Sequence, residues 1–428
     1  MTESLPKAYQ IRMERLLGEE YPAYRSKMQE PPKRSIRLNP IKTTREAFAS
    51  LTDWKLVQNG VEENGFLVEE DVPLGKHPLH AGGLFYVQEA SAQFPVTLFS
   101  DLTHAVVLDL CAAPGGKTTQ LAARMQNGGV LFSNEYVANR ANILCGNVER
   151  MGIKNTIVTN NDPNTIATRL SGLCDAVLVD APCAGEGMFR KDAEAVRAWS
   201  QAHVETCAVR QKGILSDAAR AVKPGGELVY STCSFSEEEN EQVVADFLER
   251  HRDFSLVQMQ RLYPHTCSGE GQFAALLVRN GTKTDTVCRV ERSDRCAEWD
   301  AFAAQCLIAP LSDGTLRVLR DGRLVWLPPL PCPLDGLRIV RGGLLLGERK
   351  PNRLEPSHAL ALYGGQTLFS HTEPLTEEEA IRYLKGDALP RQTEKGYLAV
   401  TYHGHALGLC KASDGLLKNH YPKGLRLL

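Results

Sequence analysis

The sequence predicts an α/β protein whose central part is a doubly wound parallel sheet. From about Ala105, short apolar runs alternate with helical patterns, which is typical of parallel strands joined by crossover helices. Glycine pairs stop several of these patterns, as at Gly128-Gly129. The chain has 428 residues, 43% of them hydrophobic and 23% charged, which fits a folded protein of several domains.

The expected strands and helices alternate along this central part. The strands are 105–110, 129–133, 156–159, 176–179 and 227–230, and the helices are 117–126, 138–151, 193–222 and 238–251. We expect the domain to span residues 101–280, with a smaller domain before it in residues 1–100.

The preceding segment combines a helical pattern with a basic stretch. Tyr9, Met13, Leu16 and Leu17 recur at helical spacing, and we expect that helix to end at Tyr21-Pro22. Between residues 25 and 45 a single acid, Glu30, stands against the cations Arg25, Lys27, Lys33, Arg34, Arg37, Lys42 and Arg45. This stretch is either a solvated surface or a face that contacts phosphate groups.

The C-terminal part predicts small mixed α/β or β-rich modules, at 281–364 and 365–428. Asp321-Gly322 between two apolar runs indicates a hairpin. Thr376 with Glu379 forms a capping box before a short helix, and 397–402 is expected to be a strand.

Composition excludes several classes of protein. A formal charge of -2 argues against a polycation that coats nucleic acid. Neither a secretory signal nor an apolar run of membrane-spanning length is present, so we expect a cytoplasmic protein that does not contact a membrane. The 12 cysteines are scattered, and no two of them are spaced for a zinc ribbon or a dithiol motif, so no metal is expected.

A glycine-containing turn follows the first expected strand and leads into a helix. This order lets a ligand approach backbone N–H groups at the carboxyl edge of a parallel sheet. The spacing is not the dinucleotide pattern, and Cys111 stands where a phosphate loop needs its first glycine, so pyrophosphate is disfavoured. The expected cofactor contacts are Cys111, Ala112, Ala113, Pro114, Gly115, Gly116 and Lys117.

Three acids stand at the ends of successive expected strands: Glu135, Asp162 and Asp180. Each of the two aspartates, taken alone, could simply cap a turn. Together with Glu135, which is placed to bind ribose hydroxyls, they predict a ligand crevice. Acids without a phosphate cradle suit an adenosine with a cationic sulfonium tail, so we expect S-adenosylmethionine as the cofactor rather than NAD.

Two cysteines stand out by position. Cys183 directly follows the fourth expected strand, and Cys233 directly follows the fifth. Loops after adjacent parallel strands open at the same edge of the sheet, so both thiols should face the methyl donor. A thiol becomes a strong nucleophile when its surroundings favour the thiolate, so the pair implies covalent catalysis.

These residues resemble the Sun-type (RsmB/RsmF/NSUN) RNA 5-methylcytosine methyltransferases, in particular the RsmF-like bacterial branch that acts on small-subunit ribosomal RNA. The matching segments are 37–40, 86–91, 110–117, 180–187 and 230–240, and 417–426 resembles the PUA-like module of that branch. The resemblance implies a Rossmann-like class I methyltransferase domain, an N-terminal RNA-binding domain, an intermediate small domain and a PUA-like RNA-binding domain.

The resemblance also implies roles for the site residues. Cys233 would add to carbon 6 of cytosine, Asp180 would bind the base near N3, and Cys183 would act in release. The target base must first leave its stack. Arg190 and Lys191 are candidate phosphate contacts, with solvated surface as the alternative. The expected partner is 16S ribosomal RNA or the small subunit, and the expected state is a monomer.

Two alternatives stay open at this point. The same chemistry could act on tRNA or DNA. The chain could also be a non-catalytic RNA-binding ribosome assembly factor, although both thiols and all three acids are present. The residues do not identify the base that removes the carbon-5 proton.

Overall fold

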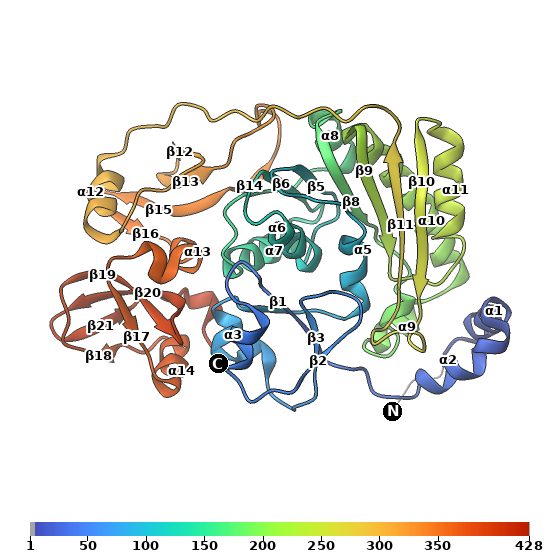
Figure 1. Cartoon of the computed structure of the whole chain (residues 1–428), viewed down its shortest axis with the longest axis horizontal. Helices are drawn as coiled ribbons and strands as arrows, with labels where there is room; N and C mark the ends of the chain where they lie inside the picture. The colour runs from blue at the N-terminus through green and yellow to red at the C-terminus, as the bar shows by residue number, and fades with distance from the viewer. Residues whose placement is uncertain (1–4, 428) are drawn as a thin grey trace.

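The computed structural model describes residues 5–427 and contains a central eight-stranded sheet in the order β10-β11-β9-β8-β5-β6-β7-β14 (Figure 1). Its five middle strands are parallel: β5 Val106–Asp109, β6 Val130–Asn134, β7 Thr156–Thr159, β8 Cys174–Asp180 and β9 Val222–Thr232. The antiparallel strands β10 Phe254–Leu262 and β11 Gln272–Arg279 extend one side. The predicted fold class is confirmed.

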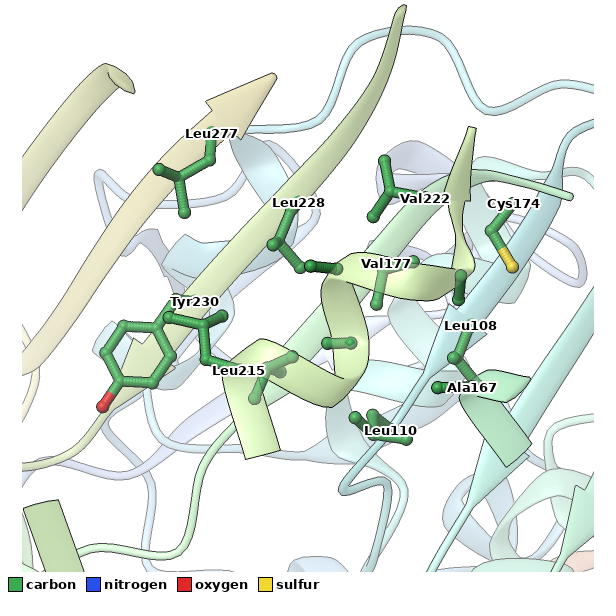
Figure 2. Close-up of a cluster of buried hydrophobic side chains, with 14 of the residues drawn as sticks. Leu108, Leu110, Ala167, Cys174, Val177, Leu215, Val222, Leu228, Tyr230 and Leu277 are labelled. Carbon is green, nitrogen blue, oxygen red and sulfur yellow. The ribbon is translucent and has the colours of Figure 1, made fainter. Parts of the chain in front are cut away.

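Helices cover both faces of this sheet because successive strand residues point to opposite sides. Val177 and Val179 pack with Leu215 and other residues of α8 Pro163–Arg169, α10 Gln201–Ala221 and α11 Glu241–Arg250 (Figure 2). Ala176 and Leu178 face the opposite core, which contains α5 Phe94–Thr97, α6 Gly116–Arg124 and α7 Ala138–Arg150. Both faces of the parallel strands are therefore buried, which explains their continuous apolar runs.

One of the expected helices of this domain needs correction, and three elements were missed. The single helix expected at 193–222 is two helices, α9 Ala193–Ala198 and α10, because Trp199 and Ser200 are extended and the Ser200 hydroxyl caps α10 by accepting a hydrogen bond from His203 N at 3.1 Å. Helix α8 and the strands β10 and β11 were not expected.

The N-terminal region is a helical segment followed by a four-stranded antiparallel sheet. Helix α1 Lys7–Leu17 agrees with the expected amphipathic helix, but its predicted stop at Tyr21-Pro22 is wrong. The chain continues through the 3-10 turn η1 Gly18–Glu20 into α2 Tyr21–Lys27, where Pro22 lies in the first turn and removes no helical hydrogen bond. The sheet contains β2 Leu56–Gln58, β3 Gly65–Val68, β1 Ser35–Leu38 and β4 Phe85–Val87, with α3 Arg45–Ala49 and α4 Pro78–Ala81.

Two cations of the basic N-terminal stretch, one buried and one half-buried, are hydrogen-bonded within the protein and cannot belong to a continuous phosphate-contacting face. Arg37 is 2% exposed. Lys42 donates from Nζ to the carbonyl oxygens of Gly82 at 2.8 Å and Arg150 at 3.3 Å, and burial lowers its pKa to about 7. The expectation of one basic surface is therefore wrong for these two residues.

The C-terminal region contains two smaller sheets. The first has β12 Thr315–Val318, β13 Arg323–Leu327, β15 Leu344–Lys350 and β16 Arg353–Pro356, with α12 Ala297–Cys306 and α13 His358–Leu368. The second has β17 Thr372–Pro374, β19 Gly396–Tyr402, β20 His405–Ser413, β21 Leu416–Asn419 and β18 Leu389–Pro390, with α14 Glu377–Lys385. The expected β12–β13 hairpin and the Thr376 capping box are confirmed.

One C-terminal strand does not stay in its own region. Strand β14 Ile339–Gly342 pairs antiparallel with β7 and becomes the outer strand of the central sheet. Arg341, 6% exposed, donates to the carbonyl oxygens of Ile153 at 2.7 Å and Thr156 at 3.1 Å. The segment expected as a separate domain at 281–364 is therefore joined to the parallel sheet. Within residues 5–427, no helix is both long enough and apolar enough to cross a lipid bilayer.

Candidate active site

The turn between β5 and α6 is held from two sides. Gly115 has φ 113°, a conformation that side chains disfavour, and a Cβ there would lie 3.0 Å from Leu144 Cδ1. Helix α7 fixes the turn, because Arg140 donates to Ala113 O at 2.7 Å and Asn147 donates to Pro114 O at 2.8 Å. These contacts fix the path of the turn across the carboxyl end of the sheet.

Arg37 holds the other side of the same turn. Its guanidinium donates to Gly116 O and to Thr119 Oγ1, each at 2.7 Å, and also to Gln88 Oε1. The sequence placed Arg37 among surface cations, whereas the structure makes it a link between the N-terminal sheet and α6. Burial lowers its pKa to about 10.

Two acids lie buried at the strand ends beside this turn. Asp109 is 0% exposed, and its Oδ2 accepts from Thr118 Oγ1 at 2.6 Å. Its other oxygen, Oδ1, has no hydrogen-bond partner among the described residues, and burial raises the pKa of Asp109 to about 7. Glu135 is 4% exposed, accepts from Val137 N at 2.8 Å, and lies 3.3 Å from Arg140.

Asp162 differs from the other acids. It is exposed, lies beyond the end of β7, and caps α8 by accepting from Thr165 N at 2.9 Å and Thr165 Oγ1 at 2.6 Å. These hydrogen bonds lower its pKa. The sequence left open that Asp162 caps a turn, and the observed contacts of Asp162 agree with that alternative.

Asp180 ends β8 within a network of donors. Its carboxylate receives Lys117 Nζ at 2.8 Å, Ser231 Oγ at 2.7 Å and Gln272 Nε2 at 3.4 Å. Burial opposes the charge of Lys117, but the carboxylate of Asp180 holds the Lys117 pKa above its ordinary value. The side chain of Lys117 therefore points to Asp180, and the residues that flank the two cysteine loops meet here.

The two cysteines singled out by the sequence lie together. Cys183 Sγ is 3.2 Å from Cys233 Sγ, and both residues are half-buried. The hydrogen bond to Cys233, and then burial, raise the pKa of Cys183. Gly187 N donates to Cys233 O at 2.7 Å, which ties the end of the first cysteine loop to the second. The expected meeting of both loops at one sheet edge is observed.

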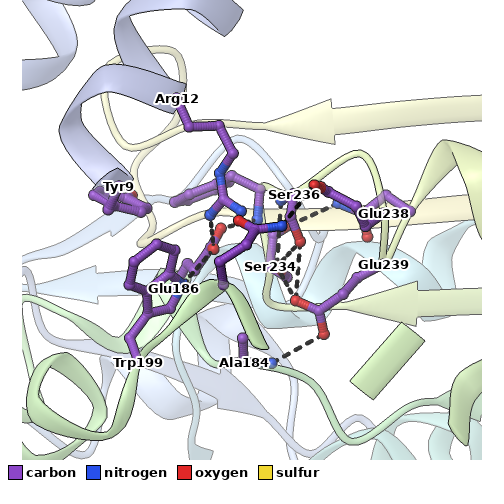
Figure 3. Close-up of polar contacts among 12 residues, drawn as sticks. Tyr9, Arg12, Ala184, Glu186, Trp199, Ser234, Ser236, Glu238 and Glu239 are labelled. Atoms are coloured by element: carbon purple, nitrogen blue, oxygen red, sulfur yellow. Dashed lines mark hydrogen bonds and ion pairs between the residues drawn. The ribbon is translucent and has the colours of Figure 1, made fainter. Parts of the chain in front are cut away.

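A buried carboxylate that sequence reasoning missed supports both cysteine loops. Glu239 is 0% exposed and accepts from Ala184 N at 3.0 Å, Gln211 Nε2 at 2.8 Å, Ser234 Oγ at 2.6 Å and Ser236 Oγ at 3.0 Å (Figure 3). Ala184 and Ser234 each directly follow one of the cysteines. Glu239 thus joins the two loops without any cation beside it among the bonded groups.

Asn240 and Gln211 complete this support. Asn240 accepts from Thr232 Oγ1 at 2.6 Å and donates to Ser234 O at 2.9 Å, so it bonds to the residues on both sides of Cys233. Gln211 donates to Pro182 O at 3.0 Å, immediately before Cys183. The sequence feature that could have indicated this support is the acidic run near the end of the segment 230–240. Such a run is usually interpreted as solvated surface.

A second buried carboxylate attaches the N-terminal helix. Glu186 is 1% exposed and forms an ion pair with Arg12 of α1, and it accepts from Trp199 Nε1 at 2.8 Å and Phe235 N at 2.7 Å (Figure 3). Tyr9 packs edge-on against Phe189 with ring centroids 4.9 Å apart. Helix α1 is therefore part of the wall behind the cysteine loops.

The prediction that Arg190 contacts phosphate is wrong. Its side chain is 4% exposed, and Nε lies 2.6 Å from Glu270 Oε2, so its charge is used inside the protein. Lys191 is exposed, with Nζ 3.9 Å from Glu270 Oε1.

Four family models match successive parts of the chain. They are the N-terminal domain of 16S rRNA methyltransferase RsmF at residues 5–90, 16S rRNA methyltransferase RsmB/F at 96–278, the RsmF rRNA methyltransferase first C-terminal domain at 301–363, and the methyltransferase RsmF PUA domain at 370–427.

Curated relatives and solved structures agree with these matches. Ribosomal RNA small subunit methyltransferase F of Erwinia tasmaniensis is 33% identical over 98% of this chain and 96% of its own length, and that of Vibrio parahaemolyticus is 35% identical over 94% and 92%. A methyltransferase homolog protein from Pyrococcus horikoshii is 28% identical with a TM-score of 0.58, covering 64% of this chain and 95% of its own. NSun6 from Pyrococcus horikoshii, at 21% identity and a TM-score of 0.56 over 66% of this chain and 100% of its own, shares the fold.

The full-length relatives, together with the paired thiols at the edge of a Rossmann-like sheet, confirm the resemblance seen in the sequence: this chain belongs to the ribosomal RNA small subunit methyltransferase F (RsmF) family of Sun-type RNA methyltransferases.

Proposed function

We propose that this protein methylates carbon 5 of a cytosine in 16S ribosomal RNA through a transient covalent bond to Cys233. The observation that carries the proposal is the pair of thiols 3.2 Å apart beside the Asp180–Lys117 pair. The names of the relatives support the choice of ribosomal RNA. Because the family is one of RNA methyltransferases, a purely structural assembly factor is disfavoured.

The residues at the strand ends fit S-adenosylmethionine. Asp109 Oδ1 is a buried acceptor that lacks a partner within residues 5–427, and it lies beside the turn whose backbone Gly115 keeps open. The turn 111–117 would hold the cofactor, Glu135 would bind the ribose hydroxyls, and Asp162 would contribute at the rim. When bound, S-adenosylmethionine supplies the methyl group that carbon 5 receives.

The chain's own residues would act on the cytosine ring. The Cys233 thiolate adds to carbon 6, and the electron pair of the 5,6 double bond becomes available at carbon 5. Asp180 would bond the base near N3 and stabilise the charge that develops there, and Lys117 Nζ, which lies 2.8 Å from the Asp180 carboxylate, would orient it.

Release reverses the addition. A base removes the carbon-5 proton, the double bond re-forms, and the sulfur of Cys233 leaves carbon 6 as a thiolate. Cys183 is proposed to act in this step because its sulfur is the neighbouring group at 3.2 Å.

Two cysteine variants test the chemistry. We expect Cys233→Ala to abolish methyl transfer while cofactor binding persists, because the cofactor contacts lie on other strands. We expect Cys183→Ala to accumulate a protein–RNA adduct that survives denaturing electrophoresis, and the double variant to show none. Binding of S-adenosylmethionine at 100 times its dissociation constant should add about 2.7 kcal/mol of stability in a thermal shift. Methylation retained by Cys233→Ala would refute the assignment.

The choice of RNA needs its own experiment. Labelled S-adenosylmethionine with 16S ribosomal RNA, small subunits and tRNA in parallel reactions compares the substrates directly. Bisulfite mapping of ribosomal RNA from a deletion strain then locates the modified cytosine. Faster transfer to tRNA would favour the alternative. We further propose that the protein acts as a cytoplasmic monomer, with residues 1–100 and the PUA-like module at 365–428 holding the RNA.

A further inference from the structure

A cavity of about 480 Å³ lies between the N-terminal sheet and the segment that follows the Cys183 loop. Such a volume is within the range of ligand pockets. The polar side chains that line it are Lys33, Arg34, Lys76, Gln88, Glu89 and Lys191. We call it the basic cavity.

Two of its lysines have no ion pair with the described residues, and the third shares a carboxylate with Arg190. Lys33 and Lys76 are exposed and form no ion pair with the described residues 5–427, and Lys191 lies 3.9 Å from a carboxylate that Arg190 already engages at 2.6 Å. Arg34, in contrast, is paired with Asp71 at 3.2 Å. The cavity therefore presents cations to solvent.

Among the described residues, Glu89 supplies the single carboxylate of the lining, and this carboxylate already accepts hydrogen bonds from the protein. Glu89 accepts from the backbone N–H groups of Ser91 at 2.9 Å, Ala92 at 2.7 Å and Glu270 at 2.7 Å. These donors stabilise the Glu89 carboxylate within the protein backbone. An anionic ligand would meet more cationic side chains than carboxylates in this lining.

The rest of the lining indicates which part of a nucleic acid fits. It consists of small or aliphatic residues such as Pro32, Pro73, Leu74 and Val87, and none of the described residues brings an aromatic ring to the lining on which a base could stack. Ammonium groups around an aliphatic floor suit phosphates and sugars, which position a strand without reading its sequence.

The basic cavity shares structural elements with the candidate active site. Gln88 lines the cavity and also reaches the cofactor turn, since a Cβ on Gly116 would lie 3.1 Å from Gln88 Nε2. Lys191 lines the cavity as well, and it follows the loop that begins at Cys183 and that Gly187 ties to Cys233 O at 2.7 Å. The lining therefore includes one residue that contacts the cofactor turn and one that follows the Cys183 loop.

We propose that Lys33, Lys76 and Lys191 bind backbone phosphates of the RNA strand that flanks the target cytosine. The proposal rests on the proposed function and assigns one binding surface to its substrate. Extruding a base from its stack costs free energy, and phosphate contacts beside the extruded nucleotide hold the strand while that cost is met.

The test compares two triple variants of the full chain. The first is Lys33→Ala, Lys76→Ala and Lys191→Ala. The matched control removes the same charge elsewhere, at Lys212, Lys283 and Lys350; Lys212 is paired with an acid on the neighbouring helix α11, and Lys350 with an acid on its own strand β15. Dissociation constants for 16S ribosomal RNA transcribed in vitro are measured over a range of KCl concentrations, and methyl transfer by the parent protein to the same RNA is measured in parallel.

We expect the cavity variant to lower the slope of log affinity against log salt by about 2, since each phosphate contact to a single strand contributes about 0.7. Affinity should fall about tenfold or more, while the thermal shift with S-adenosylmethionine and kcat at saturating RNA stay within about twofold of the parent. A slope and affinity equal to those of the control variant would overturn the proposal, as would a fall in kcat with unchanged affinity. Failure of the parent to methylate would refute the proposed function and leave the binding comparison intact.

Discussion

We expect replacement of Glu239 to slow methyl transfer, although both cysteines stay unchanged. Its Oε2 accepts from Ala184 N at 3.0 Å and from Gln211 Nε2 at 2.8 Å, so Glu239→Ala leaves the buried Ala184 N–H and one of the two Gln211 amide N–H groups without an acceptor. Hydrogen bonds to a charged group contribute about 1.5–3 kcal/mol each, so the substitution should cost about 3–6 kcal/mol of unfolding free energy. That is a large part of the 5–15 kcal/mol typical of folded proteins.

Glu239→Gln should be much milder. The amide keeps one oxygen for Ala184 and Gln211, and its NH₂ group can face the hydroxyls of Ser234 and Ser236, which can also accept. Only the charge component is lost, which amounts to about 2 kcal/mol over the two bonds to Oε2. Rescue by Gln therefore separates loss of hydrogen bonding from loss of charge.

The same change should act on catalysis through position. Ala184 and Ser234 each follow a cysteine, so release of both loops moves the sulfurs, and a misplacement of about 1 Å can cost about 100-fold in rate. We expect kcat for transfer from labelled S-adenosylmethionine to fall about 100-fold in Glu239→Ala with an unchanged KM for the cofactor, and urea unfolding to report the stability loss.

Glu238 offers the matched control. It is adjacent in sequence but only partly buried, and its one described hydrogen bond is from Gln201 at 3.0 Å. Glu238→Ala should change kcat and stability little. The reasoning is refuted if folded Glu239→Ala retains a kcat within about threefold of Glu238→Ala.

Three further predictions address the surroundings of the site. Burial raises the pKa of Asp109 to about 7, so the folded state keeps a proton that the unfolded chain loses above about pH 4. The free energy of unfolding should therefore fall between about pH 4 and pH 7, by up to about 1.4 kcal/mol per pH unit. Thermal unfolding of Asp109→Asn should depend on pH less steeply than that of the parent protein. Arg12→Ala should cost about 3–5 kcal/mol in chemical denaturation, because buried Glu186 loses its cation, and Glu186→Gln in the same chain should recover part of it. Gly187→Ala places a Cβ 2.9 Å from Gly271 O and 3.0 Å from Cys233 O, so kcat should drop more than about tenfold with cofactor affinity unchanged, whereas Gly213→Ala, with open space around it, should be silent.

The sequence could predict the parallel strands and the two cysteine loops because both are local signals. A strand buried on both faces is a continuous apolar run, and a residue directly after it must lie at the sheet edge. The positions of Cys183 and Cys233 follow from this alone, although their separation of 3.2 Å does not.

The polar support of the site could not be predicted in the same way. Arg37, Arg190 and Glu239 are charged residues that a sequence reader assigns to the surface, and they are buried because partners far along the chain complete their hydrogen bonds. Strand β14 has four residues of mixed exposure, so no local apolar run predicts it. Its partner β7 lies about 180 residues earlier in the sequence. Capping of α8 by Asp162, in contrast, was an alternative that the sequence itself offered.

Because strand β14 pairs with β7, the C-terminal third of the molecule cannot be removed without changing the central sheet. A fragment cut after residue 280 would bare the backbone groups that Ile157, Val158 and Thr159 now share with it, and an unpaired sheet edge of this kind recruits other chains.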